Sequence, residues 1–245
     1  MSALVVKNLV KSLGHKQILN NLSFEVEKGE VFGLIGSNGA GKTTTLRTIA
    51  TLLQIQSGEV SVLGLNLPQD ASEVRRILSY LPEDAGAYKH LKGREYLNFV
   101  AAFFAHKEKP SDIVARGVAI ANLGERINDR IDTYSKGMTR RLLIGRALMT
   151  LPQLAILDEP SSGLDVVNAR EVRRTIQDAA KEGMTVLLSS HNMLEVELMC
   201  NRVALIYDGR IVASGTPQDL KVRYQATDIE EVFMRVLANS AAPGV

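Results

Sequence analysis

The stretch that decides the fold is Gly36-Ser37-Asn38-Gly39-Ala40-Gly41-Lys42-Thr43, which fits the pattern G-x-x-x-x-G-K-[ST]. Polyphosphate oxygens need several hydrogen-bond donors at once, and the bare backbone N–H groups of such a loop can provide them. Glycines at positions 36, 39 and 41 remove the Cβ atoms that would block close approach, and they permit positive φ where the loop doubles back. We expect the loop to bind a nucleoside triphosphate, with Lys42 on the β- and γ-phosphates and the Thr43 hydroxyl on Mg²⁺.

The segments on either side of the loop fit this interpretation. Residues 31–35 are all apolar or glycine and predict a buried strand that runs into the loop, and residues 44–53 predict a helix that leaves it. The helix would begin at Thr44 and direct the positive end of its dipole at the phosphates. A strand, loop and helix in this order are the context that the motif requires.

Composition limits the class of protein. The chain has 245 residues, enough for one large domain or a domain with an inserted subdomain, and 45% of them are hydrophobic. A net charge of +2 gives no electrostatic case for binding nucleic acid. Cys200 is the single cysteine, which excludes an intrachain disulfide, and its apolar neighbours predict a buried side chain.

No apolar stretch approaches the roughly 20 residues needed to span a bilayer. The N-terminus also lacks a basic region followed by an apolar signal core. We therefore expect a cytoplasmic protein unless something else holds it at a membrane.

The hydrophobic pattern predicts an α/β chain with a helical insertion. We expect strands at 4–10 and 22–26, joined by 11–17, and further strands at 58–63, 154–157, 185–189, 203–207 and 211–213. Helices are expected at 113–122, 166–181, 192–200 and 229–237, the last packing on its own domain. Between about 86 and 150 strand patterns are absent, and 107–111 is a polar break. An apolar stripe in this region is interpreted as core and consists of Tyr96, Phe99, Val100, Phe103 and Phe104.

Two carboxylates follow the apolar run 154–157. Asp158 and Glu159 end this predicted strand, at the edge of a parallel sheet where the phosphate loop also lies. Asp158 can hold Mg²⁺, directly or through water. Glu159 can face a water in line with the γ-phosphate and act as general base or orienting group.

Five motifs in order now resemble the nucleotide-binding subunit of ABC transporters: 36–43, 134–138, 154–159, 162–165 and His191. The resemblance covers residues 1 to about 225. It implies a P-loop NTPase (RecA-like) core with an N-terminal antiparallel β subdomain and an inserted α-helical subdomain. The implied single domain, 1–245, has its core at 1–85 and 151–225, the helical signature subdomain at 86–150 and a C-terminal helix and tail at 226–245.

The resemblance also implies how the site is assembled. Two subunits of the family sandwich two ATP molecules, and each ATP meets one subunit's phosphate loop and the other's signature motif. Ser135 and Gly137 are the signature positions that this chain retains, whereas Tyr134, Lys136 and Met138 depart from the usual Leu-Ser-Gly-Gly-Gln. Ser135 is equally interpreted as a helix N-cap.

The remaining family positions are assigned in the same way. His191 occupies the switch position that contacts the γ-phosphate, and Asp165 is expected at the subunit interface. Glu83 stands where the family commonly has Gln, and it is assigned to the metal site. Leu13 stands where the family stacks an aromatic ring on adenine, with His15 the only ring nearby, so weak discrimination between ATP and GTP is expected.

The sequence thus predicts an ATPase that binds ATP and Mg²⁺, forms a homodimer or heterodimer and drives a separate integral membrane permease from the cytoplasmic face. Residues 80–83 and 228–233 resemble the exporter branch, which pairs with a six-helix permease. Two alternatives stay open: a soluble ABC ATPase in translation or DNA maintenance, and a non-hydrolysing regulatory module. The expected catalytic residues are Lys42, Glu159 and His191; the metal ligands are Thr43, Glu83 and Asp158; the nucleotide-binding residues are Gly36, Ser37, Asn38, Gly39, Ala40, Gly41, Lys42, Thr43, Thr44, Ser135, Gly137 and Asp165.

Overall fold

The computed structural model describes residues 2–105 and 108–241. Its strands are β1 (Ser2–Leu13), β2 (Lys16–Glu27), β3 (Val31–Ile35), β4 (Ser57–Val62), β5 (Leu65–Leu67), β6 (Leu78–Leu81), β7 (Leu154–Asp158), β8 (Thr185–Ser190), β9 (Arg202–Tyr207) and β10 (Arg210–Gly215). Its α-helices are α1 (Lys42–Ile49), α2 (Ala71–Ile77), α3 (Gly93–Ala101), α4 (Pro110–Ala121), α5 (Lys136–Leu148), α6 (Val166–Lys181), α7 (Met193–Met199), α8 (Pro217–Tyr224) and α9 (Ile229–Ala241). Short 3₁₀ turns are η1 (Ala102–Phe104), η2 (Gly124–Asn128) and η3 (Ile131–Thr133).

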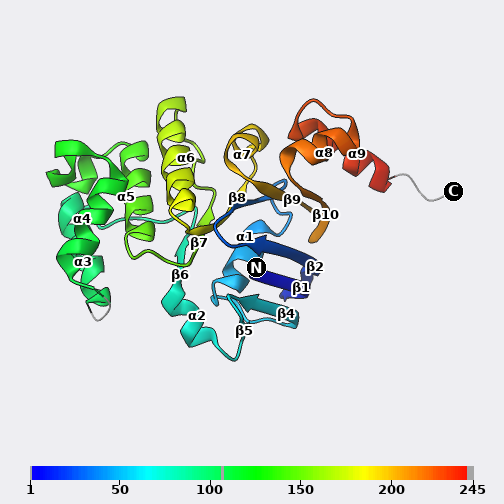
Figure 1. The fold of residues 1–245 in the computed structure, drawn as a ribbon, viewed down its shortest axis with the longest axis horizontal. Helices are drawn as coiled ribbons and strands as arrows, with labels where there is room; N and C mark the ends of the chain where they lie inside the picture. Colours follow the sequence, from blue (N-terminus) through cyan, green and yellow to red (C-terminus); the bar gives the residue numbers. More distant parts are fainter. Residues whose placement is uncertain (1, 106–107, 242–245) are drawn as a thin grey trace.

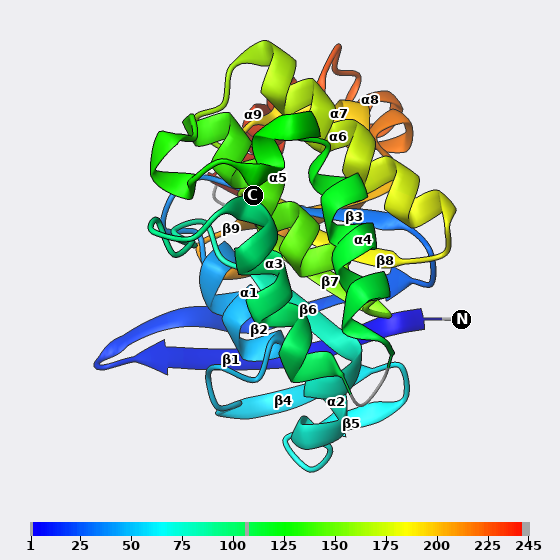
Figure 2. The same ribbon diagram turned by 90° about the vertical axis from the view of Figure 1, so that its left-hand side faces the viewer.

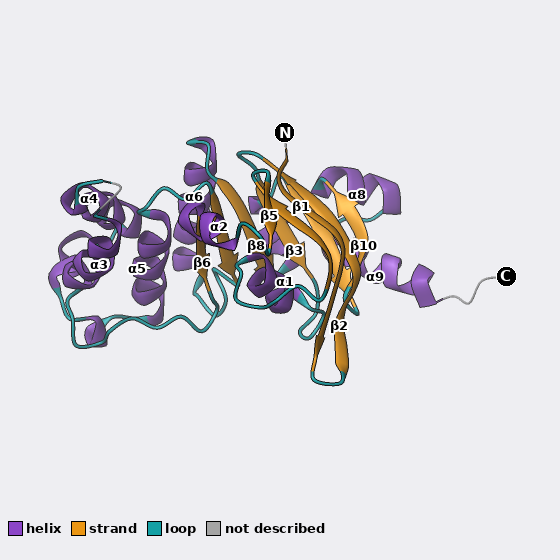
Figure 3. Cartoon of the chain, turned by 90° about the horizontal axis from the view of Figure 1, so that it is seen from below, coloured by secondary structure: helices purple, strands orange, loops and turns teal. Residues whose placement is uncertain are grey.

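The strands form two sheets, and one face of the antiparallel sheet packs on one face of the other (Figure 3). One is antiparallel, in the order β2-β1-β4-β5, and the other has the order β10-β9-β3-β8-β7-β6. In the second sheet only β10 is antiparallel to its neighbour; β3, β8, β9, β7 and β6 pair in parallel. Parallel strands place their carboxyl ends at one edge, so the phosphate loop after β3 and the acidic pair at the end of β7 meet there.

The six-stranded sheet is covered on both faces, which explains its continuous apolar strands. Along β3, Phe32 and Leu34 face the antiparallel sheet and α1, whereas Val31 and Ile35 belong to the core beneath the helices α5, α6 and α7. The side chains of β7 alternate in the same way: its even-numbered apolar residues face the antiparallel sheet, and its odd-numbered ones face the helices. Figure 2 shows α5, α6 and α7 on one side of this sheet, and the antiparallel sheet with α1 and α2 on the other.

Helices α3, α4 and α5 form a lobe at one end of the molecule, which we call the helical lobe, and α8 and α9 lie at the opposite end (Figure 1). The helices α4 and α5 approach closely because a glycine lies at the contact. A Cβ added to Gly145 would stand 2.6 Å from the carbonyl oxygen of Gly117. Larger residues would therefore separate the two helices.

The α/β fold and most of the expected elements are confirmed. The strand at 31–35 and the helix at 166–181 match β3 and α6. Asp208 and Gly209 both have positive φ, as the tight hairpin between β9 and β10 requires. The tail helix α9 buries Ile229, Val232, Phe233 and Val236 against its own domain, and Cys200 is buried, which raises the pKa of its thiol.

Several local predictions were wrong. The segment 11–17 is not a connection: β1 and β2 pair as far as Leu13 and Lys16, and only Gly14 and His15 form the turn. The helix α1 ends at Ile49 rather than at residue 53, because Thr51 adopts a positive φ of 62°. Elements too short for a periodic pattern were missed, namely β5, α2, β6 and α8. Of the polar break at 107–111, residue 107 lies outside the described residues, and Pro110 already begins α4.

The aromatic stripe is only partly core. Tyr96 is buried, but the side chains of Phe99 and Phe103 are 46% and 66% exposed. The stripe does not lie on one helix, because α3 ends at Ala101 and Phe103 and Phe104 belong to η1. Phe99 packs edge-on against both Tyr88 and Phe103, with ring centroids 5.5 Å and 5.4 Å apart, so these three rings form a surface patch that we call the aromatic patch.

Candidate functional site

The three glycines of the phosphate loop have different structural roles. A Cβ on Gly36 would stand 2.2 Å from the carbonyl oxygen of Ile206, so Gly36 permits close packing of the loop on β9. Gly39 and Gly41 adopt φ of +82° and +110°, backbone conformations in which a residue with a Cβ atom is strained. Gly41 directly precedes α1, so the loop delivers the chain to the helix N-terminus as predicted.

Lys42 is almost fully buried and lies across the loop. Its ammonium donates to the carbonyl oxygens of Gly36 at 2.8 Å and Ser37 at 3.3 Å, and it lies 3.6 Å from Oε1 of Glu159. A buried charge is costly without such partners. The loop therefore holds one positive charge directly beside the end of β7.

The Asp158 carboxylate accepts hydrogen bonds from hydroxyl groups on three different elements, α1, β6 and β8. Its Oδ1 accepts from Ser189 Oγ at 2.5 Å and from Thr43 Oγ1 at 3.3 Å, and its Oδ2 accepts from Tyr80 Oη at 3.4 Å. These donors fix the carboxylate, and burial raises the pKa of Tyr80. Thr43 and Asp158 come together as predicted, whereas the contributions of Ser189 and Tyr80 were not anticipated.

Glu159 lies between two nitrogen groups. Its Oε2 lies 2.9 Å from Nδ1 of His191, and its other oxygen faces Lys42. The backbone of Glu159 has a φ of +48°, a conformation that costs a non-glycine residue about 1–3 kcal/mol. Its N–H donates to the carbonyl oxygen and the hydroxyl of Ser189, which hold the residue in this turn.

A cavity of about 250 Å³ opens over the phosphate loop. Its walls include Asn38, Gly39, Gly41, Lys42, Thr43, Thr44, Glu83 and Glu159, as expected, and also Lys16 and Ile18 from β2. The sequence pattern gave no sign of Lys16 and Ile18, because they reach the loop only through the long hairpin of β1 and β2. Leu13 is 46% exposed and, like His15, is not among the residues that line this cavity.

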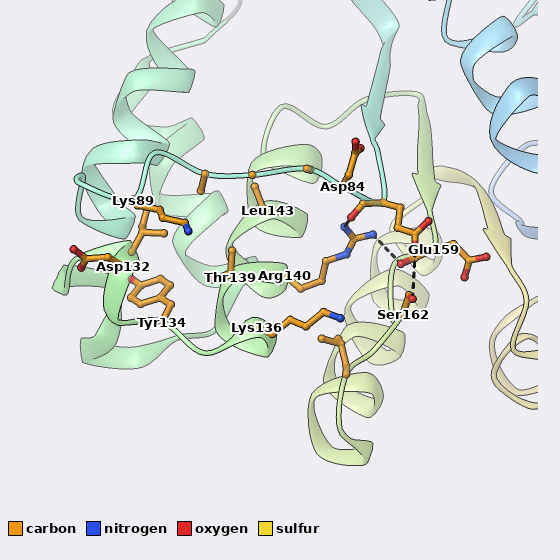
Figure 4. Close-up of a pocket in the computed structure, with 16 residues that line it drawn as sticks. Asp84, Lys89, Asp132, Tyr134, Lys136, Thr139, Arg140, Leu143, Glu159 and Ser162 are labelled. Atoms are coloured by element: carbon orange, nitrogen blue, oxygen red, sulfur yellow. Dashed lines mark hydrogen bonds between the residues drawn. The ribbon is translucent and has the colours of Figure 1, made fainter.

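Glu83 lies on the wall between this cavity and a larger one of about 730 Å³ at the base of the helical lobe (Figure 4). Its Oε1 accepts a long hydrogen bond of 3.5 Å from Ser162 Oγ. Glu159 also borders both cavities. Within the described part of the chain, no three acidic, histidine or cysteine side chains form a metal-binding cluster by themselves, so Glu83, Asp158 and Glu159 do not converge on one point.

The signature segment lies apart from the chain's own phosphate loop. Ser135 caps α5 by accepting from the N–H of Met138 at 3.2 Å, and Asp165 caps α6 by accepting from the N–H of Asn168 at 3.0 Å. A Cβ on Gly137 would stand 2.4 Å from the Asn168 side chain, so the two caps are packed together. Ser135, Gly137 and Asp165 do not appear among the residues that line the phosphate-loop cavity.

A phosphate loop, a helix N-terminus and an adjacent pair of carboxylates define a P-loop nucleoside-triphosphate-binding protein. The sequence pattern of the family described as ABC transporter matches residues 19–162, more than half of the chain. The chain is 37% identical over 219 residues to a linearmycin resistance ATP-binding protein of Bacillus subtilis, covering 89% of this chain and 70% of that protein. It is 32% identical over 234 residues to the Nod factor export ATP-binding protein I of Rhizobium etli, covering 95% and 74%.

Solved structures agree with these relatives. The ATP-binding subunit of an ABC transporter superposes with a TM-score of 0.85 and 28% identity, covering 96% of this chain and all of that one. An ABC transporter cassette in its ADP conformation superposes with a TM-score of 0.81 at 22% identity and supports the fold. The chain belongs to the ABC transporter ATP-binding family and is an ATP-hydrolysing subunit, as the resemblance predicted. In residues 2–105 and 108–241, none of the helices combines the length and the apolar character needed to cross a membrane.

Proposed function

We propose that this chain pairs with a second ATPase subunit around two Mg-ATP and powers export through a separate integral membrane permease, from the cytoplasmic face. The observation that carries the proposal is the position of Glu159 between Lys42 and His191. A carboxylate held at this point can accept a proton from water, while the flanking nitrogen groups bind the phosphate that the water attacks. The names of the resistance and export relatives support outward transport.

Mg²⁺ fits the donor set at the carboxyl end of the sheet. Magnesium prefers hard oxygen ligands and keeps several waters, so it needs only one or two protein oxygens beside the phosphates. The Thr43 hydroxyl and the Asp158 carboxylate lie 3.3 Å apart and are such a pair. When bound, the ion would neutralise charge on the phosphates, and Glu83, which lines the phosphate-loop cavity, would supply a further carboxylate beside it.

The exposed surface around the signature segment supports a dimer. Ser135 is exposed and lies outside the chain's own phosphate-loop cavity, so its hydroxyl is available to the nucleotide of a second subunit. Gly137 is buried against Asn168, and it lets the start of α5 pack closely beside this serine. Asp165 is followed by Val166 and Val167, whose side chains are 85% and 71% exposed. A second subunit that covers this surface would bury both valine side chains together with the signature segment.

The aromatic patch supports a permease as the second partner. Tyr88 is 60% exposed and stands between Ala87 and Lys89, which line the 730 Å³ cavity. A cavity beside exposed aromatic rings can receive a short helix from another protein. In this arrangement the partner would contact the segment that carries Glu83 and so reach the nucleotide site.

Purification of the tagged chain from detergent-solubilised native membranes tests the proposal. A multi-helix integral protein recovered in roughly equal amount is the expected result. A Phe103→Ser variant, which removes one exposed ring of the aromatic patch, should recover less of this protein, whereas Leu52→Ser on a distant surface should recover as much as wild type. Recovery of ribosomal or DNA-associated partners instead would favour a soluble ABC ATPase and leave the ATPase assignment intact.

A further inference from the structure

Arg140 joins three segments of the chain that are far apart in sequence. Its side chain extends from α5 in the helical lobe and is 8% exposed, and Figure 4 shows it pointing toward the Glu159 end of the cavity. Five backbone carbonyl oxygens accept hydrogen bonds from the guanidinium: Pro160 from Nε at 2.9 Å, Pro82 and Glu83 from Nη1 at 3.1 Å and 3.2 Å, and Asp158 and Glu159 from Nη2 at 2.7 Å and 2.9 Å.

This arrangement uses the full donor capacity of an arginine. A guanidinium has five N–H groups in a rigid planar fork, and here each nitrogen makes as many bonds as it has hydrogens. A lysine ammonium has at most three donors and no fixed plane, so it could satisfy only part of the set. Burial lowers the pKa of Arg140, whereas the negative charges of Glu83 and Asp158 act in the opposite direction. An arginine remains protonated at neutral pH, so the guanidinium is a buried cation in which every N–H group has a hydrogen-bond acceptor.

The acceptors lie on both sides of a strained residue. The Asp158 carbonyl belongs to the peptide group before Glu159, and the Glu159 carbonyl belongs to the peptide group after it. The φ of +48° at Glu159 is therefore held by a bond on each of its two peptide planes, in addition to the bonds that its N–H donates to Ser189. The direction of the Glu159 side chain follows from the orientation of these planes.

We propose that Arg140 is a positioning residue for ATP hydrolysis, which fixes the Asp158 and Glu159 carboxylates and ties their position to that of α5 and Glu83. Any rotation of the helical lobe must then either carry the end of β7 with it or break these bonds. The inference concerns hydrolysis by the chain itself and does not depend on the permease or the direction of transport.

The neighbouring residue provides a matched control. Arg141 also donates from its guanidinium to backbone carbonyls, from Nε to Ala121 at 3.1 Å and from Nη2 to Asn122. These carbonyls lie at the end of α4, inside the helical lobe and away from the carboxylates. Replacing Arg141 removes the same charge and the same kind of contact without touching β7.

The test measures kcat and KM for ATP in the full chain carrying Arg140→Gln, Arg140→Lys, Arg141→Gln or Arg141→Lys. Turnover is measured at protein concentrations where the wild-type rate per subunit no longer depends on concentration. The assay temperature lies below the Tm of every variant. Because a misplacement of about 1 Å can cost up to roughly 100-fold in rate, Arg140→Gln should lower kcat about 10- to 100-fold. Its KM should stay within about threefold, because the phosphate loop is intact. Arg140→Lys should lie between wild type and Arg140→Gln, and both Arg141 variants should lower Tm with kcat near wild type.

Two results would overturn the assignment. One is a folded Arg140→Gln protein with wild-type kcat, or one in which only KM rises. The other is a loss of kcat in Arg141→Gln as large as in Arg140→Gln, which would mean that loosening the helical lobe is sufficient. If Arg140→Gln does not fold, Arg140→Lys decides, since an unchanged kcat in that variant contradicts the role.

Discussion

Nδ1 of His191 lies 2.9 Å from Oε2 of Glu159, although the two residues are on different loops at the carboxyl edge of the sheet. An ionised carboxylate only accepts hydrogen bonds, so this contact requires a proton on Nδ1. We expect the other ring nitrogen, Nε2, to contact the γ-phosphate of bound ATP. The carboxylate and the imidazole thus orient each other before any nucleotide enters.

Replacing Glu159 with Gln should separate binding from hydrolysis. The amide keeps the size of the side chain but cannot take a proton from water, so kcat should fall about 100- to 1000-fold. Lys42 retains its two carbonyl partners, so ATP should still bind, and the variant should accumulate as a dimer in size-exclusion chromatography with Mg-ATP. Glu125→Gln, at an exposed carboxylate, is the control. Near-normal turnover by Glu159→Gln would exclude the assigned role.

Replacing Ser135 with Ala should lower both the stability of the protein and its kcat, whereas loss of a helix cap alone lowers only stability. Loss of the N-cap bond to Met138 should lower stability by about 1 kcal/mol. Thr216 caps α8 in the same way, accepting from the N–H of Asp219 at 3.1 Å. The helix α8 lies at the opposite end of the molecule from the helical lobe, and Thr216 does not line the phosphate-loop cavity. Thr216→Ala should therefore show a similar loss of stability in thermal unfolding and an unchanged kcat, whereas Ser135→Ala should also lower kcat. Equal kcat in the two variants would leave Ser135 as a cap only.

Sequence patterns predicted the parts of the site that are local in the chain. The loop at 36–43, the strand before Asp158 and the cap at Ser135 each follow from a few adjacent residues, whereas the cap at Asp165 was not predicted. The contacts of Ser189 and Tyr80 with Asp158 depend on the strand order β8-β7-β6, which no local pattern specifies. The partners of Arg140 are backbone carbonyls, which carry no residue identity and so leave no trace in the sequence.

The chain should discriminate only weakly between ATP and GTP. Leu13 lies at the end of β1, paired with Lys16, which lines the phosphate-loop cavity. An aliphatic side chain lacks the ring that stacks on adenine, so the Kd values for ATP and GTP should be similar. Leu13→Tyr should tighten ATP binding by a few-fold, because an aromatic pair is worth about 0.5–1.5 kcal/mol. Competition binding measures both proteins, with Leu52→Tyr as a distant control. A large preference of the wild-type chain for ATP would contradict this prediction.

The start of α9 should lose a stabilising contact in acid. The carboxylate of Glu231 accepts from the backbone N–H of Thr227 at 2.7 Å and pairs with Arg235 at 2.6 Å, and these contacts lower its pKa to about 2. Because the folded pKa lies below the ordinary value of 4.5, the contribution to stability is complete above about pH 4.5 and is lost as the pH falls toward 2. Glu231→Gln should therefore lower Tm at pH 7, and the difference from wild type should shrink between pH 4.5 and pH 3. The adjacent exposed Glu230, changed to Gln, controls for loss of one negative charge. A difference in Tm that stays constant over this range would mean that the carboxylate charge is not what stabilises the helix start.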